Sequence, residues 1–190
     1  MTCRGSRFAD GAKRNPDGQV FMKNRETDEW LKQNEKATRQ PIRKWGHFCK
    51  HDKYLKPIIP SKYNIGIVLN QNNLDLLKGL EPWCSNIYCD SSLGQQYNTT
   101  EQKRTSFKLY ERVLPKKKKK NNDIIVEIGP RFTERDWSHI SMLSEIIDNG
   151  RKDIEQQLIH HSDDPEFKLN NLSITIKSLK TTEKELIVCE

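Results

Sequence analysis

Apolar residues are scarce in this sequence. Of its 190 residues 34% are hydrophobic and 31% are charged, whereas a compact domain of this length usually has more apolar material. No run approaches the roughly 18 apolar residues that cross a bilayer, and the first fifteen residues lack the apolar segment of a secretory signal. We therefore expect no membrane partner and a core that uses part of the chain, with the rest extended or ordered by a partner.

Signatures of catalysis are also missing. The sequence has no glycine-rich phosphate loop, no nucleophile motif and no recognisable pair of carboxylates. His160 and His161 precede Asp163 and Asp164, but adjacent histidines at the end of a helix are the simpler interpretation. We expect a protein that is not an enzyme and that uses no cofactor.

The five cysteines are odd in number and scattered, which suits a reducing compartment better than a disulfide framework. Some of them join histidines in a weak metal-ligand pattern. The candidates are His47, Cys49, His51, Cys84 and Cys89. Because the two-residue spacing usual for paired zinc cysteines is absent, we expect no metal.

Positive charge is concentrated in the first part of the chain. Residues 1–122 contain 25 Lys and Arg against 12 Asp and Glu, whereas residues 123–190 contain 8 against 14. A polarised chain of this kind attracts polyanions through its basic part, and nucleic acid is the commonest polyanion in a cell. The alternative is a protein subunit of a nuclear complex whose basic segment binds an acidic partner.

Residues 38–63 combine positive charge with aromatic rings. Lysine and arginine can contact phosphates, and exposed rings can stack on bases, as is typical of RNA and single-strand binding. The alternative for any single ring is a place in the core. With one arginine from further along the chain, the predicted nucleic-acid contacts are Arg39, Arg43, Lys44, Trp45, Lys50, Lys53, Tyr54, Lys56 and Arg131.

A dense cationic run follows Leu114-Pro115. It consists of Lys116, Lys117, Lys118, Lys119 and Lys120. A run of this kind has the form of a nuclear import signal, because a short exposed cationic segment suits the acidic groove of an import receptor. The same lysines could instead contact phosphates, and the two uses do not conflict.

The stretch Val126–Thr133 reads Val-Glu-Ile-Gly-Pro-Arg-Phe-Thr. It resembles a signature near the end of the Brix domain, which occurs in ribosome-assembly factors that bind pre-ribosomal RNA. Phe107 and Tyr110 resemble the strand that precedes the signature in that family, and Ile125 resembles the start of the next strand. The resemblance implies RNA rather than DNA as the ligand, a role in ribosome biogenesis, and a nuclear or nucleolar location. Independently of the family, Gly129-Pro130 predicts a sharp turn that presents Arg131.

Hydrophobic periodicity predicts an α+β fold. We expect a short helix that begins at Asp28 and ends before Pro41, a buried strand at 65–69, a short helix at 74–80, and a loop at 90–102. Strands at 107–113 and 124–128 would form a small, mostly antiparallel sheet with a C-terminal hairpin of 172–176 and 186–188. Residues 1–63 are expected to be a basic, largely irregular arm, and residues 64–190 the folded domain, with a lysine-rich loop at 115–122.

Two helices should pack on this sheet. Thr133 and Asp136 have the spacing of a capping box, and Gly150 predicts a stop before a second helix at 151–161. Two helices joined by a short turn also fit a helix-turn-helix DNA-binding protein. Asp153 and Glu155 offset the positive charge of the second helix, so structural packing is the favoured interpretation.

Overall fold

The computed structural model describes residues 28–48, 50–58, 60–160 and 164–181. The chain forms two compact units, residues 1–38 and 39–190. Helix α3 (Asp28–Trp45) begins in the first unit and ends in the second, and all other described elements belong to the second. The folded unit therefore includes residues 39–63, which the sequence assigned to an irregular arm. The helix also continues past Pro41, where the sequence predicted that it would end.

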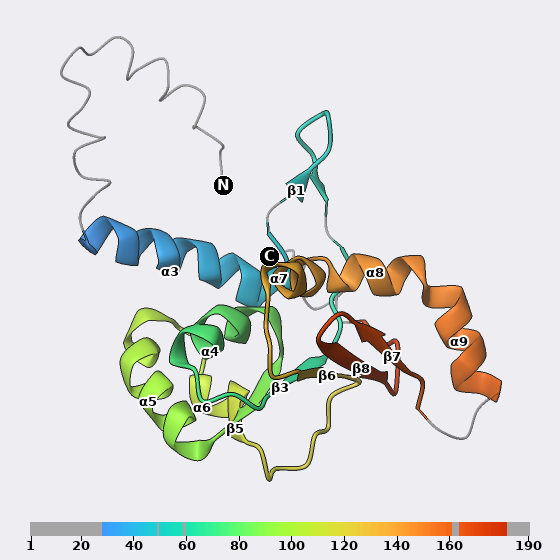
Figure 1. The fold of residues 1–190 in the computed structure, drawn as a ribbon. Coiled ribbons are helices and arrows are strands. Elements are labelled where there is room, and N and C mark those ends of the chain that lie inside the picture. The colour runs from blue at the N-terminus through green and yellow to red at the C-terminus, as the bar shows by residue number, and fades with distance from the viewer. Residues whose placement is uncertain (1–27, 49, 59, 161–163, 182–190) are drawn as a thin grey trace. The chain divides into compact units, whose positions relative to one another are not determined.

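A six-stranded mixed sheet forms the centre of the second unit (Figure 1). Its strands, in spatial order, are β5 (Val113–Pro115), β4 (Asn86–Cys89), β3 (Ile65–Leu69), β6 (Ile124–Ile128), β8 (Leu172–Ile176) and β7 (Glu166–Leu169). The first four strands are mutually parallel, whereas β8 is antiparallel to both of its neighbours. The α+β class is confirmed, but the expectation of a mostly antiparallel sheet is wrong.

Helical connections explain the parallel pairing. The chain passes from β3 to β4 through α4 (Leu74–Leu80) and a 3₁₀ turn, η2 (Glu81–Trp83). It passes from β4 to β5 through α5 (Ser91–Glu101), η3 (Gln102–Arg104) and α6 (Leu109–Arg112). A crossover of this length returns the chain to the edge where the previous strand began, so the next strand runs parallel.

Two sequence predictions fail in this region. Residues 90–102 are mostly helix, not loop, because α5 buries a stripe too narrow to give a clear hydrophobic period: Leu93, Gly94, Tyr97 and Glu101. Residues 107–113 contain a helical turn, and only Val113 belongs to a strand. The expected hairpin partner of β8 at 186–188 lies outside the described residues, and within them β8 pairs with β6 and β7.

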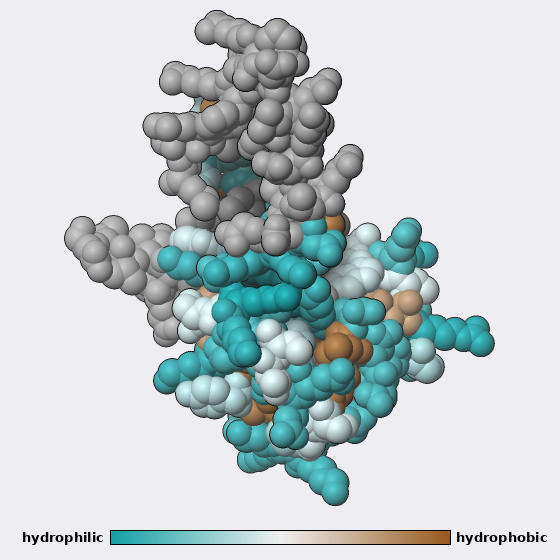
Figure 2. Space-filling view, turned by 90° about the vertical axis from the view of Figure 1, so that its left-hand side faces the viewer, coloured by the Kyte–Doolittle hydropathy of each residue, from teal (hydrophilic) through white to brown (hydrophobic). Residues whose placement is uncertain are grey.

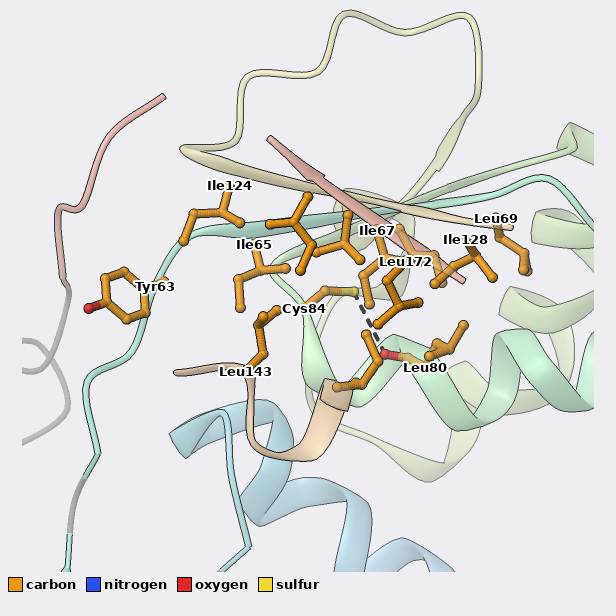
Figure 3. Packing of buried hydrophobic residues seen from close by; sticks show 14 of the residues in the cluster. Tyr63, Ile65, Ile67, Leu69, Leu80, Cys84, Ile124, Ile128, Leu143 and Leu172 are labelled. Carbon is orange, nitrogen blue, oxygen red and sulfur yellow. Dashed lines mark hydrogen bonds between the residues drawn. The ribbon is translucent and has the colours of Figure 1, made fainter. Parts of the chain in front are cut away.

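The main core lies on one face of the sheet, where every second strand residue points (Figure 3). Ile65, Ile67 and Leu69 of β3 pack there with Ile124 and Ile128 of β6. Helices α4 and α5 cover this face together with three further helices. These are α7 (Glu134–Ser141), α8 (Leu143–Asn149) and α9 (Arg151–His160).

The C-terminal helices begin as the sequence predicts but are three in number, not two. Thr133 and Asp136 form the capping box of α7. Met142 separates α7 from α8, because its backbone leaves the helical conformation, and Gly150 ends α8. No helix within the described ranges combines the length and the apolar character needed to span a bilayer.

The other face of the sheet carries a smaller cluster, formed by Val68, Tyr88, Leu114 and Ile125. The loop 116–123 crosses this face, from the end of β5 to the start of β6 (Figure 1). The loop is anchored by the buried amide of Asn122, whose oxygen accepts a hydrogen bond from the Tyr88 hydroxyl. The amide nitrogen donates to the side-chain oxygens of Asn64 and Asn86, at 2.7 and 2.9 Å.

We predict that Gly66→Ala destabilises the protein by about 1–3 kcal/mol, the range typical of overpacking a filled interior. A Cβ at Gly66 would lie 2.7 Å from Cγ of Asn122, so the alanine would displace the amide that anchors the loop. Chemical denaturation measures the loss. Gly150→Ala is the matched control, because its Cβ would make ordinary contacts of 3.5 Å or more. Equal stabilities of the two variants would contradict the anchoring role of Asn122.

Candidate nucleic-acid interface

The residues predicted to contact nucleic acid do not form one surface. Arg39 and Arg43 are buried, at 9% and 2% exposure. Lys50, Lys53, Tyr54 and Lys56 belong to a small hairpin, and the lysine run lies on the opposite side of the sheet (Figure 1). Each group therefore has to be considered separately.

Arg39 and Arg43 belong to a buried network of charged groups at the end of α3. Arg43 Nε donates to Oε2 of Glu81 at 2.8 Å, and Arg39 Nη1 donates to Oε1 of Glu101 at 2.7 Å. Arg112 donates to the other oxygen of Glu81, at 2.7 Å. The Tyr97 hydroxyl donates to Glu81 Oε2 at 3.0 Å. The prediction that Arg39 and Arg43 contact phosphates is therefore wrong, because their guanidinium groups are committed to buried carboxylates.

The network also sets the protonation of Glu81. Burial alone would raise the pKa of this carboxyl, but the charges of Arg112 and Arg43 and their hydrogen bonds outweigh burial, and the pKa is lowered from its ordinary value of 4.5. Burial raises the pKa of the Tyr97 hydroxyl. Glu81 is therefore the anion of the network, and Tyr97 stays a neutral donor at physiological pH.

A hairpin of β1 (Lys50–His51) and β2 (Pro57–Ile58) presents the exposed part of the predicted set. Asp52 orders its tip, because one carboxylate oxygen accepts from the backbone N–H groups of Tyr54 and Lys56, at 2.8 and 2.9 Å. Leu55 occupies the left-handed region, with φ of 63°. Tyr54 and Leu55 at the tip are 70% and 75% exposed.

Cationic groups lie beside aromatic rings in this part of the chain. Lys53 Nζ is 5.0 Å from the centre of the Tyr54 ring, and Lys44 Nζ is 5.0 Å from that of Trp45, which is half-buried. At the base of the hairpin the half-exposed Phe48 packs edge-to-face on Trp83, with ring centres 5.0 Å apart. Lys50 forms an ion pair with Glu145 of α8, so Lys53 and Lys56 are the hairpin lysines available to a ligand.

The lysine run forms a closed turn with its two ends tied down. Lys116 pairs with Asp90 at 3.3 Å, and Lys120 lies 3.9 Å from Glu127. The backbone N–H of Lys118 donates to the carbonyl of Pro115 at 2.9 Å. Lys117, Lys118 and Lys119 are exposed and have no ion-pair partner among the described residues. These three lysines are the available cations of the loop.

The Brix-like stretch lies where β6 ends. β6 stops at Ile128, and the chain then turns through Gly129-Pro130 to the exposed Arg131, as the sequence predicts. Glycine is required here because a Cβ at position 129 would lie 2.7 Å from the carbonyl oxygen of Asn171. Arg131 is therefore available to a ligand at the edge of the sheet.

The weak metal candidates are dispersed. Cys84 and Cys89 are buried free thiols, and burial raises their pKa values to about 12 and about 11. His47 is buried, His51 is exposed, and Cys49 lies outside the described residues. In the ranges that the structure describes, His, Cys, Asp and Glu side chains form no group of three that could hold a metal ion.

The residues that organise these surfaces could not be identified from the sequence. Glu81, Tyr97 and Glu101 bind the two arginines, and Asn122 anchors the lysine loop. Their partners lie between 16 and 62 positions away in the chain. No local spacing identifies a contact of that range, and a single buried glutamate in a polar sequence has no distinguishing pattern.

Replacing Glu81 tests the network. Glu81→Gln keeps the shape but leaves Arg43 and Arg112 without their shared anion, so we expect the free energy of unfolding to fall by about 3–5 kcal/mol. Glu111→Gln is the control, because Glu111 pairs with Lys108 on the surface. Chemical denaturation of both variants measures the difference. A loss no greater than that of the control would show that the buried pairs contribute nothing.

The same variant has a pH signature. Since the pKa of Glu81 is lower in the folded chain, its contribution is fully present above the ordinary value of 4.5 and is lost as the pH falls through the folded pKa. The stability of the unmodified protein should therefore decrease more steeply on acidification below pH 4.5 than that of Glu81→Gln. Parallel stability curves in this range would contradict the assignment.

Comparisons with known proteins return no match. No protein-family model matches the chain, and the comparisons with curated proteins and with solved structures found no match. The Brix resemblance thus rests on the residues quoted above, and the function has to be argued from the side chains themselves.

Proposed function

We propose that this protein is a non-enzymatic, nuclear nucleic-acid-binding protein, with RNA the favoured ligand, and that the β1–β2 hairpin is its contact surface. The observation that carries the proposal is the exposure of Tyr54 between Lys53 and Lys56 at an ordered tip. An aromatic ring stacked on a base contributes about 1–3 kcal/mol, and adjacent lysines add contacts to the phosphates.

The shape of the tip favours single-stranded ligands. Unpaired bases expose their faces to stacking, whereas the bases of a duplex are already stacked. The carboxylate of Asp52 fixes the backbone beneath Tyr54, which reduces the entropy lost on binding. A pre-ribosomal RNA, as the Brix resemblance implies, offers single-stranded loops of this kind.

The lysine loop is a second basic surface, separate from the hairpin. Lys117, Lys118 and Lys119 are exposed, and the loop that carries them lies on the side of the sheet opposite the hairpin, so one short nucleic acid would not reach both surfaces (Figure 1). We propose that the loop binds an import receptor, with phosphate contact as its alternative use. The side of the molecule shown in Figure 2 is mainly hydrophilic.

A protein partner is the second candidate. Phe48 and Ile58, at 48% and 45% exposure, lie at the base of the same hairpin as Leu55. Apolar side chains in this number would suit a subunit of a nuclear complex better than phosphates. A helix-turn-helix interpretation of residues 133–161 has weaker support, because Arg151 of α9 pairs with Glu155 at 2.8 Å and the carboxylate offsets its positive charge.

The hairpin proposal predicts the effect of three substitutions. Lys53→Ala/Tyr54→Ala/Lys56→Ala should weaken binding of a single-stranded RNA at least about tenfold, because a stacking contact and two phosphate contacts are lost. The salt dependence of the binding constant should also become shallower by about 1.4, since each contact with a single strand contributes about 0.7 to that slope. Fluorescence anisotropy at several salt concentrations measures both quantities.

Lys103→Ala is the matched control, because Lys103 is exposed and lies in η3, away from the hairpin. It should leave both the affinity and the salt slope nearly unchanged. If the triple variant binds RNA as tightly as the control, the hairpin is not the interface. The protein-subunit alternative would be supported if neither the unmodified protein nor the triple variant bound RNA, while the unmodified protein still bound a protein complex.

The lysine loop can be tested in cells. Lys117→Ala/Lys118→Ala/Lys119→Ala removes three exposed charges at a stability cost within about 0.5 kcal/mol. Fused to a reporter too large to diffuse, the variant should be cytoplasmic, whereas the unmodified fusion enters the nucleus. An unrelated import signal should restore the nuclear location, and RNA affinity through the hairpin should be unaffected. Normal nuclear entry of the variant would end the import proposal.

A further inference from the structure

The parallel half of the sheet contains a topological switch point. From β3 the chain proceeds to β4 on one side, while β6, on the other side of β3, leads on to the hairpin of β7 and β8. The loops after β3 and β6 therefore diverge in opposite directions. In open sheets of this type, small molecules bind in the crevice outside the carboxyl ends of the strands at that point.

A cavity of ≈ 440 Å³ occupies this position. Asn70 and Gln71, which follow β3, line it on one side, and Gly129 and Pro130, which follow β6, line it on the other. The turn between β7 and β8 closes it with Asn170 and Asn171. Its volume is within the range of small-molecule sites. The amide nitrogens of Gln71, Asn170 and Asn171 already donate to Gly129 and Asp136. The whole amide of Asn70 and the amide oxygens of the other three side chains are therefore the groups that suit a hydrogen-bonding ligand.

The neighbouring strand ends contribute opposite charges. Asp90 follows β4 and Lys116 follows β5, and a smaller cavity of ≈ 260 Å³ lies between these strand ends and α5. Lys116 Nζ is 3.3 Å from Asp90 and 3.4 Å from the carbonyl oxygen of Asn70. Lys116 therefore connects the rim of the small cavity with the rim of the large one.

Asp90 has a conformation that suits ligand binding. It is the N-cap residue of α5, where an aspartate normally accepts a hydrogen bond from the helix, but its side chain makes no such bond. Its carboxylate is half-exposed and is directed to Lys116 at the edge of the sheet. Asp90 lies directly after β4, the second of the parallel strands in chain order, and 20 residues after Asn70. An aspartate in this position is well placed to accept hydrogen bonds from the hydroxyls of a ribose.

The same crevice is poorly suited to a phosphate. The turn after β3 reads Asn-Gln-Asn-Asn, without the glycines that let a backbone approach a pyrophosphate. Asn73 already caps α4 by accepting from the N–H of Leu76, and the charge of Asp90 would repel an anion. A neutral ligand rich in hydroxyl groups suits the crevice better than a phosphate does.

We propose that this carboxyl edge binds a ribonucleoside, with the ribose hydroxyls donating to Asp90 and the base in the larger cavity. The site is separate from the hairpin, so it is independent of the proposed binding of RNA. The amide of Asn70 can donate to and accept from the edge of a base, and the amide oxygen of Asn171, whose nitrogen donates to Asp136, can accept from it.

Titration calorimetry on the full chain tests the proposal, with adenosine and uridine as probes. We expect at least one nucleoside to bind, and its 2′,3′-dideoxy form to bind at least about tenfold more weakly, because hydrogen bonds to a charged group are lost. Asp90→Asn should weaken binding of the ribonucleoside by a similar factor and leave RNA binding unchanged. Asp153→Asn, an exposed aspartate of α9, is the control and should have no effect.

Four results would overturn the proposal. One is the failure of both nucleosides to bind at millimolar concentration. The second is equal affinity for the dideoxy form, and the third is unchanged affinity of Asp90→Asn with a normal thermal midpoint. The fourth is displacement of the nucleoside by inorganic phosphate alone, which would make the site an anion site and not a ribose site.

Discussion

The ion pair between Arg43 and Glu81 is the contact on which the arrangement of the second unit depends. Both side chains are fully buried. A buried charge without a partner costs several kcal/mol, so the end of α3, the start of η2 and the end of α6 have to meet at this point. The pair thus attaches residues 39–45, which the sequence assigned to an irregular arm, to the folded sheet.

Because of such pairing, part of the positive charge of the chain is not available to a ligand. Two arginines that a count of charges assigns to nucleic acid serve the interior, and Lys50, Lys116 and Lys120 are paired with acidic side chains. Of the lysines and arginines predicted to bind a polyanion, two groups remain exposed without an acidic partner among the described residues: Lys53 and Lys56 at the hairpin tip, and Lys117, Lys118 and Lys119 in the lysine loop. Lys44 and Arg131 are exposed elsewhere on the surface. Two separate small basic groups suit the two proposed partners, a nucleic acid and an import receptor, better than one extended polyanion.

The parallel strands have a consequence of their own. Because β3, β4, β5 and β6 run in the same direction, the residues that follow them gather at one edge, and Asn70, Asp90, Lys116 and Gly129 come together from distant parts of the chain. A mostly antiparallel sheet would have divided these residues between its two edges. The proposed nucleoside site therefore depends on the part of the topology that the sequence did not predict.

The sequence by itself determined the elements with strong local signals. Apolar runs specified β3 and β6, alternation specified β8, and Thr133 with Asp136 specified the start of α7, because each depends on neighbours within a few residues. The exposure of the lysine run was also foreseeable, since a run of charges stays in solvent in most folds.

Only the tertiary structure decided the direction of the strands and which charged side chains are buried in ion pairs. The helix α5 buries too narrow a stripe to be recognised, so the crossover that makes β4 and β5 parallel was invisible in the sequence. Arg43 resembles any surface arginine until Glu81, 38 positions away, is placed beside it. Pairing at such separations depends on packing the whole unit, because burial of a charge is favourable only when its partner is buried with it.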